Sequence, residues 1–281
     1  MIPHMQRWSN WYPLSGEADV YQNIPTKQAG LYRIRSPQRR ELIYIGQTGR
    51  CLRERLRALR KGAYSQSMPY NDPHTAAPNL WVWRQEANLE FEFSFLTTAV
   101  DTPLRQGLED YFLWRHRQEK GCSTLCNYGR FHKSWMKPSN KKQGRIGRKL
   151  EANQFNPAGL SSSSPLVQLG ASFDENWMSL NWSEPEPLES SHIKPLPNHA
   201  AIYRLLDVTS REVIYIGETQ SLAHRLRTHT KGSWGVNPVF FSFADDINLS
   251  ESHLRHEIEV DLIGAFYQER GCVPLFQYGK R

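Results

Sequence analysis

The feature that most constrains this chain is an internal repeat. The stretch ELIYIGQTGRCLRERLRALRKG at 41–62 returns as EVIYIGETQSLAHRLRTHTKG at 212–232, an offset of 171 residues that shortens to 170 within the stretch. Farther along, LRQGLEDYFLWRHRQEKGCSTLCNYGR at 104–130 aligns without a gap with LRHEIEVDLIGAFYQERGCVPLFQYGK at 254–280. This later offset is 150 residues, so the first copy holds an insert of 20 residues between the two blocks. We therefore predict a duplicated domain.

The extent of the repeat sets the predicted domain boundaries. We place the first domain at 10–130, with an aromatic insert at about 63–88, and the second domain at 181–281. A total of 281 residues is enough chain for a hydrophobic core in each. The segment 131–180 is basic and then serine-rich, a composition typical of a flexible or draped linker.

Both copies predict the same order of elements, namely two strands joined as a hairpin, a helix, a third strand and a second long helix. The predicted strands cover 30–36, 41–47 and 91–96 in the first copy, and 201–207, 212–218 and 239–244 in the second. Leu52, Leu56 and Leu59 recur at helical spacing, and Gly121 and Gly271 end the long helices. The predicted fold class is α/β (α+β), with two small domains, each a three-stranded antiparallel sheet flanked by helices, arranged as a pseudo-dimer.

Composition excludes several classes of protein. Hydrophobic residues make up 39% of the chain, as in globular proteins, and no apolar stretch approaches the ~20 residues of a membrane span. The N-terminus lacks the apolar core of a signal peptide, so we expect a cytoplasmic protein with no membrane partner. Four cysteines are too few and too scattered for a disulfide framework, and Cys122 and Cys126 have no second pair for zinc.

The net charge of +7 is distributed unevenly along the chain. Residues 1–150 carry 25 Lys and Arg against 12 Asp and Glu, whereas residues 151–281 carry 10 against 16. The first half is therefore strongly cationic and the second half mildly acidic. This asymmetry indicates a polyanionic partner that is held mainly by the first half of the chain.

Both copies repeat polar residues that a hydrophobic core does not need. Each has a tyrosine on its first strand, a second tyrosine on the next strand, an arginine on the following helix and a glutamate on the long helix. In chain order these residues are Tyr32, Tyr44, Arg55 and Glu109, and then Tyr203, Tyr215, Arg225 and Glu259. Such a set suits phosphodiester hydrolysis, because a carboxylate can hold a Mg²⁺-type cation. An arginine can neutralise charge on the phosphate, and a phenol can orient or deprotonate the attacking water.

The motifs that carry these tyrosines identify a resemblance to a known family. GLY followed by IYIG, and AIY followed by IYIG, resemble the GIY-YIG nucleases, which include homing endonucleases, some restriction enzymes and the excision-repair incision nuclease. The resemblance covers both repeats. It implies a Mg²⁺-dependent DNA endonuclease, with Mn²⁺ as a substitute, in which Glu109 and Glu259 ligate the metal. The tyrosines of each copy would then handle the water, and Arg55 and Arg225 would steady the scissile phosphate.

Several positions depart from the family pattern. Many members carry a histidine one helical turn after the arginine, which His229 matches in the second copy, whereas the first copy has Leu59 there. Many members also place an asparagine just beyond the glutamate helix. Asn127 matches it in the first copy, and the second copy has Gln277. We therefore count Asn127 and His229 among the predicted catalytic residues.

Three regions of the first half are predicted to contact DNA. Arg50, Arg53, Arg57 and Arg60 line one side of the first helix, with Lys61 beside them. The insert offers side chains suited to stacking on bases or probing a groove, although its tryptophans equally suit a small accessory core: Tyr70, His74, Trp81, Trp83 and Arg84. The basic segment after the first repeat resembles a flexible minor-groove arm, with Lys141, Lys142, Arg145, Arg148 and Lys149.

These observations predict an endonuclease of double-stranded DNA, of restriction or phage-defence type, with one active site per strand. The duplication would let the chain act alone, as a covalent pseudo-dimer, and no organic cofactor is expected. Two alternatives stay open. One is a structure-specific nuclease of repair or recombination, which would prefer flaps, branches or damaged DNA. The other is a DNA-binding module in which one or both copies are degenerate.

Overall fold

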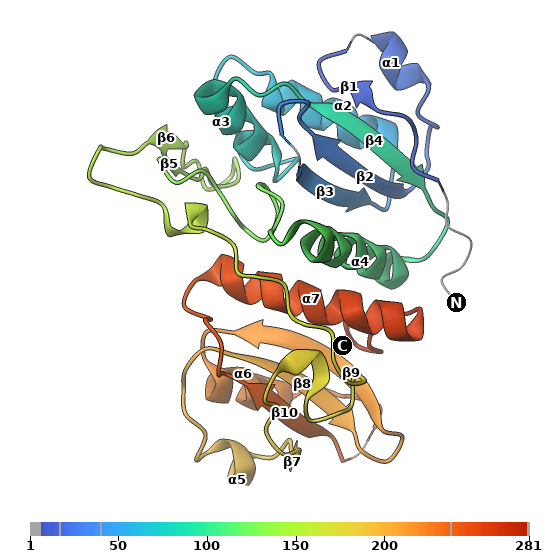
Figure 1. The fold of residues 1–281 in the computed structure, drawn as a ribbon, viewed down its shortest axis with the longest axis vertical. Coiled ribbons are helices and arrows are strands. Elements are labelled where there is room, and N and C mark those ends of the chain that lie inside the picture. The colour runs from blue at the N-terminus through green and yellow to red at the C-terminus, as the bar shows by residue number, and fades with distance from the viewer. Residues whose placement is uncertain (1–6, 17, 40, 237, 280–281) are drawn as a thin grey trace. The chain divides into compact units, whose positions relative to one another are not determined.

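The structure is a computed structural model that describes residues 7–16, 18–39, 41–236 and 238–279. It is a mixed α/β protein with antiparallel sheets, and it divides into two compact units (Figure 1). The first unit comprises His4–Asp101 with Ser123–Ser161, and the second comprises Thr102–Cys122 with Ser162–Arg281.

The first unit contains a four-stranded antiparallel sheet in the order β1-β4-β2-β3. Its elements are β1 (Tyr12–Pro13), α1 (Ala18–Gln22), β2 (Gly30–Arg35), β3 (Leu42–Thr48), α2 (Leu52–Ala63), α3 (Ala77–Ala87), β4 (Glu92–Thr97), the short hairpin β5 (Trp135–Met136) and β6 (Arg148–Lys149), and the 3-10 turn η1 (Pro157–Gly159). The prediction of three strands missed β1, because a two-residue edge strand leaves no alternating pattern in the sequence.

The second unit repeats this sheet order as β7-β10-β8-β9, again antiparallel. Its elements are α4 (Thr102–Lys120), the 3-10 turn η2 (Trp177–Ser179), β7 (Glu186–Pro187), α5 (Ser190–Ile193), β8 (Ala201–Asp207), β9 (Glu212–Thr219), α6 (Leu222–His229), β10 (Phe240–Ala244) and α7 (Ser252–Arg270). The edge strand β7 was missed for the same reason as β1. Both long helices end before a glycine with positive φ, at Gly121 and Gly271, as the sequence predicts.

The strand register places the two tyrosines of each copy on one face of the sheet. Tyr32 on β2 lies opposite Gly46 on β3, and Ile34 lies opposite Tyr44. Because side chains alternate along a strand, these four residues share a face. A Cβ atom on Gly46 would lie 2.7 Å from the Tyr32 hydroxyl, so glycine is required for the phenol to cross the neighbouring strand. Gly217 meets the Tyr203 hydroxyl in the same way, at 2.5 Å.

The helix that follows each hairpin packs on this face through its apolar stripe. Leu52, Leu56 and Leu59 of α2 are completely buried, and they join a core that includes Ile34 and Ile43. In the second unit, Leu222 and Leu226 of α6 are buried in the same manner. Full burial of a leucine contributes about 1.5–3 kcal/mol, so the stripe fixes the helix on the sheet and thereby fixes its arginine beside the tyrosines.

The predicted first domain boundary is wrong at α4. This helix comes from the first repeat, yet it packs side by side with α7 inside the second unit (Figure 1). Gly264 of α7 allows the close approach, because a Cβ atom there would lie 2.5 Å from Trp114 Cβ. Trp114 is 1% exposed and shares a core with Leu262. The repeat in the sequence therefore does not coincide with the compact units of the fold.

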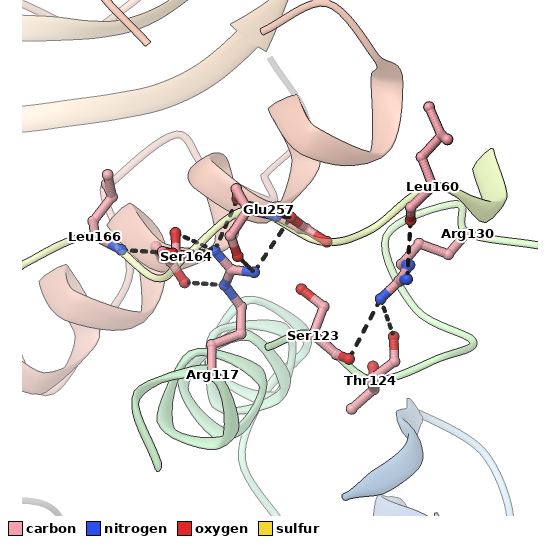
Figure 2. A network of polar contacts seen from close by, with 10 residues as sticks. Arg117, Ser123, Thr124, Arg130, Leu160, Ser164, Leu166 and Glu257 are labelled. Atoms are coloured by element: carbon pink, nitrogen blue, oxygen red, sulfur yellow. Dashed lines mark hydrogen bonds and ion pairs between the residues drawn. The ribbon is translucent and has the colours of Figure 1, made fainter. Parts of the chain in front are cut away.

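Parts of the segment 131–180 lie against the two units, which fits the draped alternative of the prediction and not the flexible one. Its first part forms the β5–β6 hairpin of the first unit. Its second part lies against α7, where the backbone N–H groups of Ser163 and Leu166 donate to Glu257 and Asp261 at 2.8 and 3.0 Å. Figure 2 shows this segment beside Arg117, which donates a hydrogen bond to it and forms an ion pair with Glu257. Trp177 then enters the core at 2% exposure.

The insert of the first copy contains a helix that its composition did not predict. Helix α3 spans Ala77–Ala87 and begins with proline in its first turn, where the missing N–H costs nothing.

The four cysteines are free thiols. Among the described residues, no helix has the length and apolar character needed to cross a membrane.

Candidate active site

The second unit gathers four of the predicted catalytic side chains on its sheet face. Tyr203 comes from β8, Tyr215 from β9, and Arg225 and His229 from successive turns of α6. Arg225 Nε donates to the Tyr203 hydroxyl at 3.0 Å, and Arg225 Nη2 reaches the Tyr215 hydroxyl at 3.5 Å. The Tyr203 hydroxyl also lies 2.7 Å from His229 Nε2. One buried phenol is therefore hydrogen-bonded to a guanidinium and to an imidazole.

The His229 ring is held in place by the aromatic residues around it. It is completely buried, and its centroid lies 5.4 Å from both Tyr203 and Tyr215 and 5.3 Å from Trp234. The indole N–H of Trp234 donates to the His229 carbonyl at 3.0 Å. The sequence did not single out Trp234. Burial raises the pKa of Tyr203 well above its ordinary value, an effect that Tyr215 reinforces and Arg225 opposes.

The first unit builds the same arrangement from β2, β3 and α2. Arg55 Nε donates to the Tyr32 hydroxyl at 3.3 Å, and the Tyr32 and Tyr44 rings lie 5.9 Å apart, against 6.0 Å for Tyr203 and Tyr215. The Tyr32 hydroxyl again has an imidazole partner at 2.7 Å, and this partner is Nε2 of His74. The first copy therefore has a histidine beside its first tyrosine, although Leu59 occupies the position that aligns with His229.

His74 reaches this position from the insert, not from the helix that carries Arg55. Its side chain is 1% exposed and lies 5.8 Å from the Tyr32 ring and 5.9 Å from the Tyr44 ring. The His74 ring is buried and contacts Tyr32 in this structure, whereas its contact with DNA stays a prediction. Arg55 Nη1 also donates to the Pro73 carbonyl at 2.7 Å, which ties the insert loop to α2.

The hydrogen bonds of His74 indicate which of its ring nitrogens carries the proton. The Ala76 N–H donates to His74 Nδ1 at 3.2 Å, so Nδ1 carries no proton and Nε2–H donates to Tyr32. Burial and then the charge of Arg55 lower the pKa of His74 well below its ordinary value, which keeps the ring neutral. The Tyr32 oxygen accepts from both Arg55 and His74.

A group of carboxyl groups lies near the second site on α7, β9 and α4. Burial, together with the nearby charges of Glu218 and Asp110, raises the pKa of Glu259 to about 8, and the charge of Arg225 opposes this rise. Glu218 pairs with Arg255 at 2.8 Å, and Asp110 accepts a hydrogen bond from Tyr278.

These carboxyl groups fit a hard divalent cation in part. Crowded oxygens that resist ionisation are the kind of donors that Mg²⁺ stabilises when it keeps most of its waters. Over the residues that the structure describes, no cluster of three or more His, Cys, Asp and Glu side chains has the arrangement of a metal site. The ligation of a cation by Glu259 stays a prediction. Glu109 lies on α4 in the second unit, whereas Tyr32, Tyr44 and Arg55 belong to the first unit.

Asn127 and Gln277 share one structural role. The Asn127 amide accepts the Ile45 N–H at 3.0 Å and donates to the Ile45 carbonyl at 2.7 Å. Gln277 makes the same pair of bonds with Ile216, both at 3.0 Å. Each amide thus grips the residue that follows the second tyrosine of its copy. Asn127 therefore has a positioning role in this structure, because this pair of backbone bonds occupies both ends of its amide, and its catalytic role stays a prediction.

The residues predicted to hold DNA divide into exposed and structural groups. Arg53 is structural, because its guanidinium donates to the carbonyls of Gln22 and Ile24 at 2.8 Å. Lys149 pairs with Glu86, also at 2.8 Å. The remaining cations of α2 and of the β5–β6 hairpin are exposed: Arg50, Arg57, Arg60, Lys61, Lys141, Lys142, Arg145 and Arg148.

The aromatic side chains of the insert form the accessory core that the sequence left open. Trp81 is 8% exposed and packs with Val82 and Phe131. Trp83 packs against the sheet core and makes an edge contact with His132. Arg84 donates to the Ala63 carbonyl at 3.0 Å, and Tyr70 is half-buried. Base stacking by Trp81 is therefore excluded in this conformation.

Comparison of the chain with protein-family models, with curated proteins and with solved structures finds no match. The case for a function therefore depends on the geometry of the two tyrosine clusters.

Proposed function

We propose that this chain is a Mg²⁺-dependent DNA endonuclease of the GIY-YIG type. It would hydrolyse phosphodiester bonds in double-stranded DNA and serve in restriction or phage defence. The observation that carries the proposal is the hydroxyl of the first-strand tyrosine, which lies 2.7 Å from an imidazole in both units and accepts an arginine N–H in both.

Packing alone gives no reason for this cluster. A buried hydroxyl or guanidinium is costly unless it is hydrogen-bonded, so a phenylalanine core would be simpler to stabilise. The two histidines come from non-equivalent positions of the repeat, yet they complete the same cluster. Because histidines from two different positions of the repeat form the same arrangement, a catalytic role is favoured over a packing role.

In the proposed reaction, the tyrosine of the first strand orients the attacking water through its hydroxyl. The histidine and the second tyrosine hold that phenol in place and exclude other rotamers. Arg225, which is partly exposed, offers guanidinium N–H groups to the phosphate and opposes the negative charge that grows on it. A divalent cation held through Glu259 would supply Lewis-acid stabilisation of the same charge.

Cleavage of supercoiled plasmid in the presence of Mg²⁺ tests this function. The wild-type chain should produce linear DNA, whereas Glu259→Ala should stop at nicked circles if each copy cuts one strand. Glu109→Ala should behave in the same way for the other strand. Glu119→Ala is the matched control, since Glu119 lies on α4 with its side chain 58% exposed, and it should cut like the wild type.

Two results would count against the proposal. Linear product from Glu259→Ala at the wild-type rate would remove the second copy from the mechanism. No cleavage of plain, branched or damaged DNA by the wild-type chain with Mg²⁺ or Mn²⁺, together with tight salt-sensitive binding, would favour a DNA-binding module instead.

A further inference from the structure

A cavity of about 200 Å³ lies beside Tyr44 in the first unit. One wall comes from Asn79 on α3, and another comes from Arg130 and Lys137, which follow the end of the first repeat. Its other lining residues are Thr75, Cys126, Asn127, Tyr128, Gly129 and Phe131. The cavity therefore adjoins the second tyrosine of the candidate site without belonging to the tyrosine cluster.

Among the described residues, the lining of this cavity has positive charge and no carboxylate. Lys137 makes no hydrogen bond or ion pair with another described residue, and burial lowers its pKa without an opposing acid. Burial also raises the pKa of the Cys126 thiol, which keeps that group neutral. A partly buried ammonium without a counter-charge is costly, so its presence indicates an anion that arrives from outside.

Two further polar atoms in the walls lack partners among the described residues. Arg130 donates through its Nη atoms to the carbonyls of Ser123, Thr124 and Leu160 (Figure 2), but its buried Nε has no hydrogen-bond partner. Asn79 is 2% exposed, and its Oδ1 atom also has none, although its Nδ2 donates to the Arg130 carbonyl at 2.9 Å. Buried polar atoms are usually satisfied, so these two indicate a missing ligand.

We propose that this cavity binds a phosphoryl group, with Lys137 and Arg130 as its cationic contacts. The Asn79 carbonyl oxygen would accept from a hydroxyl or amino group on the same ligand. A DNA strand that passes Tyr44 and a free nucleotide share this chemistry. The DNA source rests on the proposed function, whereas the phosphoryl site itself does not.

The cavity beside the second tyrosine cluster differs in charge. It measures about 450 Å³ and is lined by His229, Trp234 and small or apolar residues. In the portion of the chain that the structure describes, no Lys or Arg lines it. The phosphoryl site is therefore a property of the first copy, in agreement with the excess of basic residues in the first half of the chain.

The test uses the full chain with Lys137→Met, which keeps the length of the side chain and removes its charge. Lys194→Met is the matched control, because Lys194 is exposed and lies in the other unit. One arm measures binding of inorganic phosphate and of deoxyadenosine 5′-monophosphate by titration calorimetry. The second arm measures duplex DNA binding by fluorescence anisotropy over a range of NaCl concentrations without divalent cations. Thermal unfolding checks the fold, and Lys137→Met should melt no lower than the wild type.

The two arms distinguish the two sources of the phosphoryl group. If DNA supplies it, Lys137→Met should reduce the slope of log K against log[NaCl] by about 0.9, the value for one lost phosphate contact. If a free nucleotide supplies it, Lys137→Met should abolish monophosphate binding and leave the DNA slope unchanged. A folded variant that matches the wild type in both arms would overturn the proposal. Neither arm measures cleavage, so a failure of the nuclease proposal would be a separate result.

Discussion

The hydroxyl of Tyr32 lies 2.7 Å from Nε2 of His74, the distance that also separates Tyr203 from His229. His229 stands four residues after the arginine of its own helix, whereas His74 lies outside α2, in the loop before α3. The two copies therefore place an imidazole at the same point beside the first tyrosine, although the two histidines do not align in the repeat. This equivalence makes His74 and His229 a matched pair for experiment.

We predict that His74→Ala and His229→Ala each impair one strand cut while leaving the other. The loss should be about 10²-fold in the rate of that cut, the size expected when a catalytic side chain loses the group that positions it. Nicked plasmid should accumulate with either variant, and the double variant should be inactive. His224→Ala is the control, since His224 is exposed on α6. Full activity of folded His74→Ala would show that the insert only packs against Tyr32.

Much of the fold was predictable from the sequence, because the repeat displays each strand and helix twice. The register that places Tyr32 beside Tyr44 follows from alternation on a short hairpin. The position of His74 did not follow, since a loop of Pro, Asn and Asp has no periodicity to indicate where it folds back. The packing of α4 on α7 was also unpredictable, because a helix with apolar residues on one face does not reveal which copy it covers.

We predict that Glu259→Gln stabilises the metal-free chain at alkaline pH. In the folded chain the pKa of Glu259 is about 8, against an ordinary value of 4.5. The folded chain therefore has its full stability below pH 4.5 and loses part of it as the pH rises through 8. The glutamine variant lacks this loss, so its melting temperature should exceed that of the wild type at pH 8.5 and match it at pH 5. The exposed Glu184→Gln control should change neither value.

The same measurement tests the cation. Mg²⁺ should raise the melting temperature of the wild type at pH 8.5, because it stabilises the ionised carboxylate. It should have little effect on Glu259→Gln. An equal Mg²⁺ response in both proteins would place the cation elsewhere.

We predict that Arg117→Ala strongly destabilises the second unit. The Arg117 side chain is completely buried, and its guanidinium makes two bonds to Asp261, at 2.7 and 3.0 Å, with Glu257 at 3.3 Å (Figure 2). Removing one partner of a buried ion pair costs about 3–5 kcal/mol, because the carboxylates are left without a counter-charge. Urea unfolding measures the loss.

Arg115 provides the control for Arg117. It lies on the same helix and pairs with Glu119 at 3.4 Å, but the two side chains are 44% and 58% exposed. Arg115→Ala should lower the free energy of unfolding by less than about 1 kcal/mol. Equal losses for the two variants would contradict the buried network.

We predict that Asn127→Ala reduces cleavage through stability and strand position, not through chemistry. The substitution strands the N–H and carbonyl of Ile45, two buried groups that each cost about 1–3 kcal/mol when unsatisfied. Gln277→Ala should have the same effect at Ile216, and exposed Asn10→Ala should have none. Hydrogen exchange of residues 43–47 should accelerate in Asn127→Ala. If instead cleavage vanished while unfolding and exchange stayed at wild-type values, the amide would act on the substrate, because a positioning residue cannot fail without moving the strand that it holds.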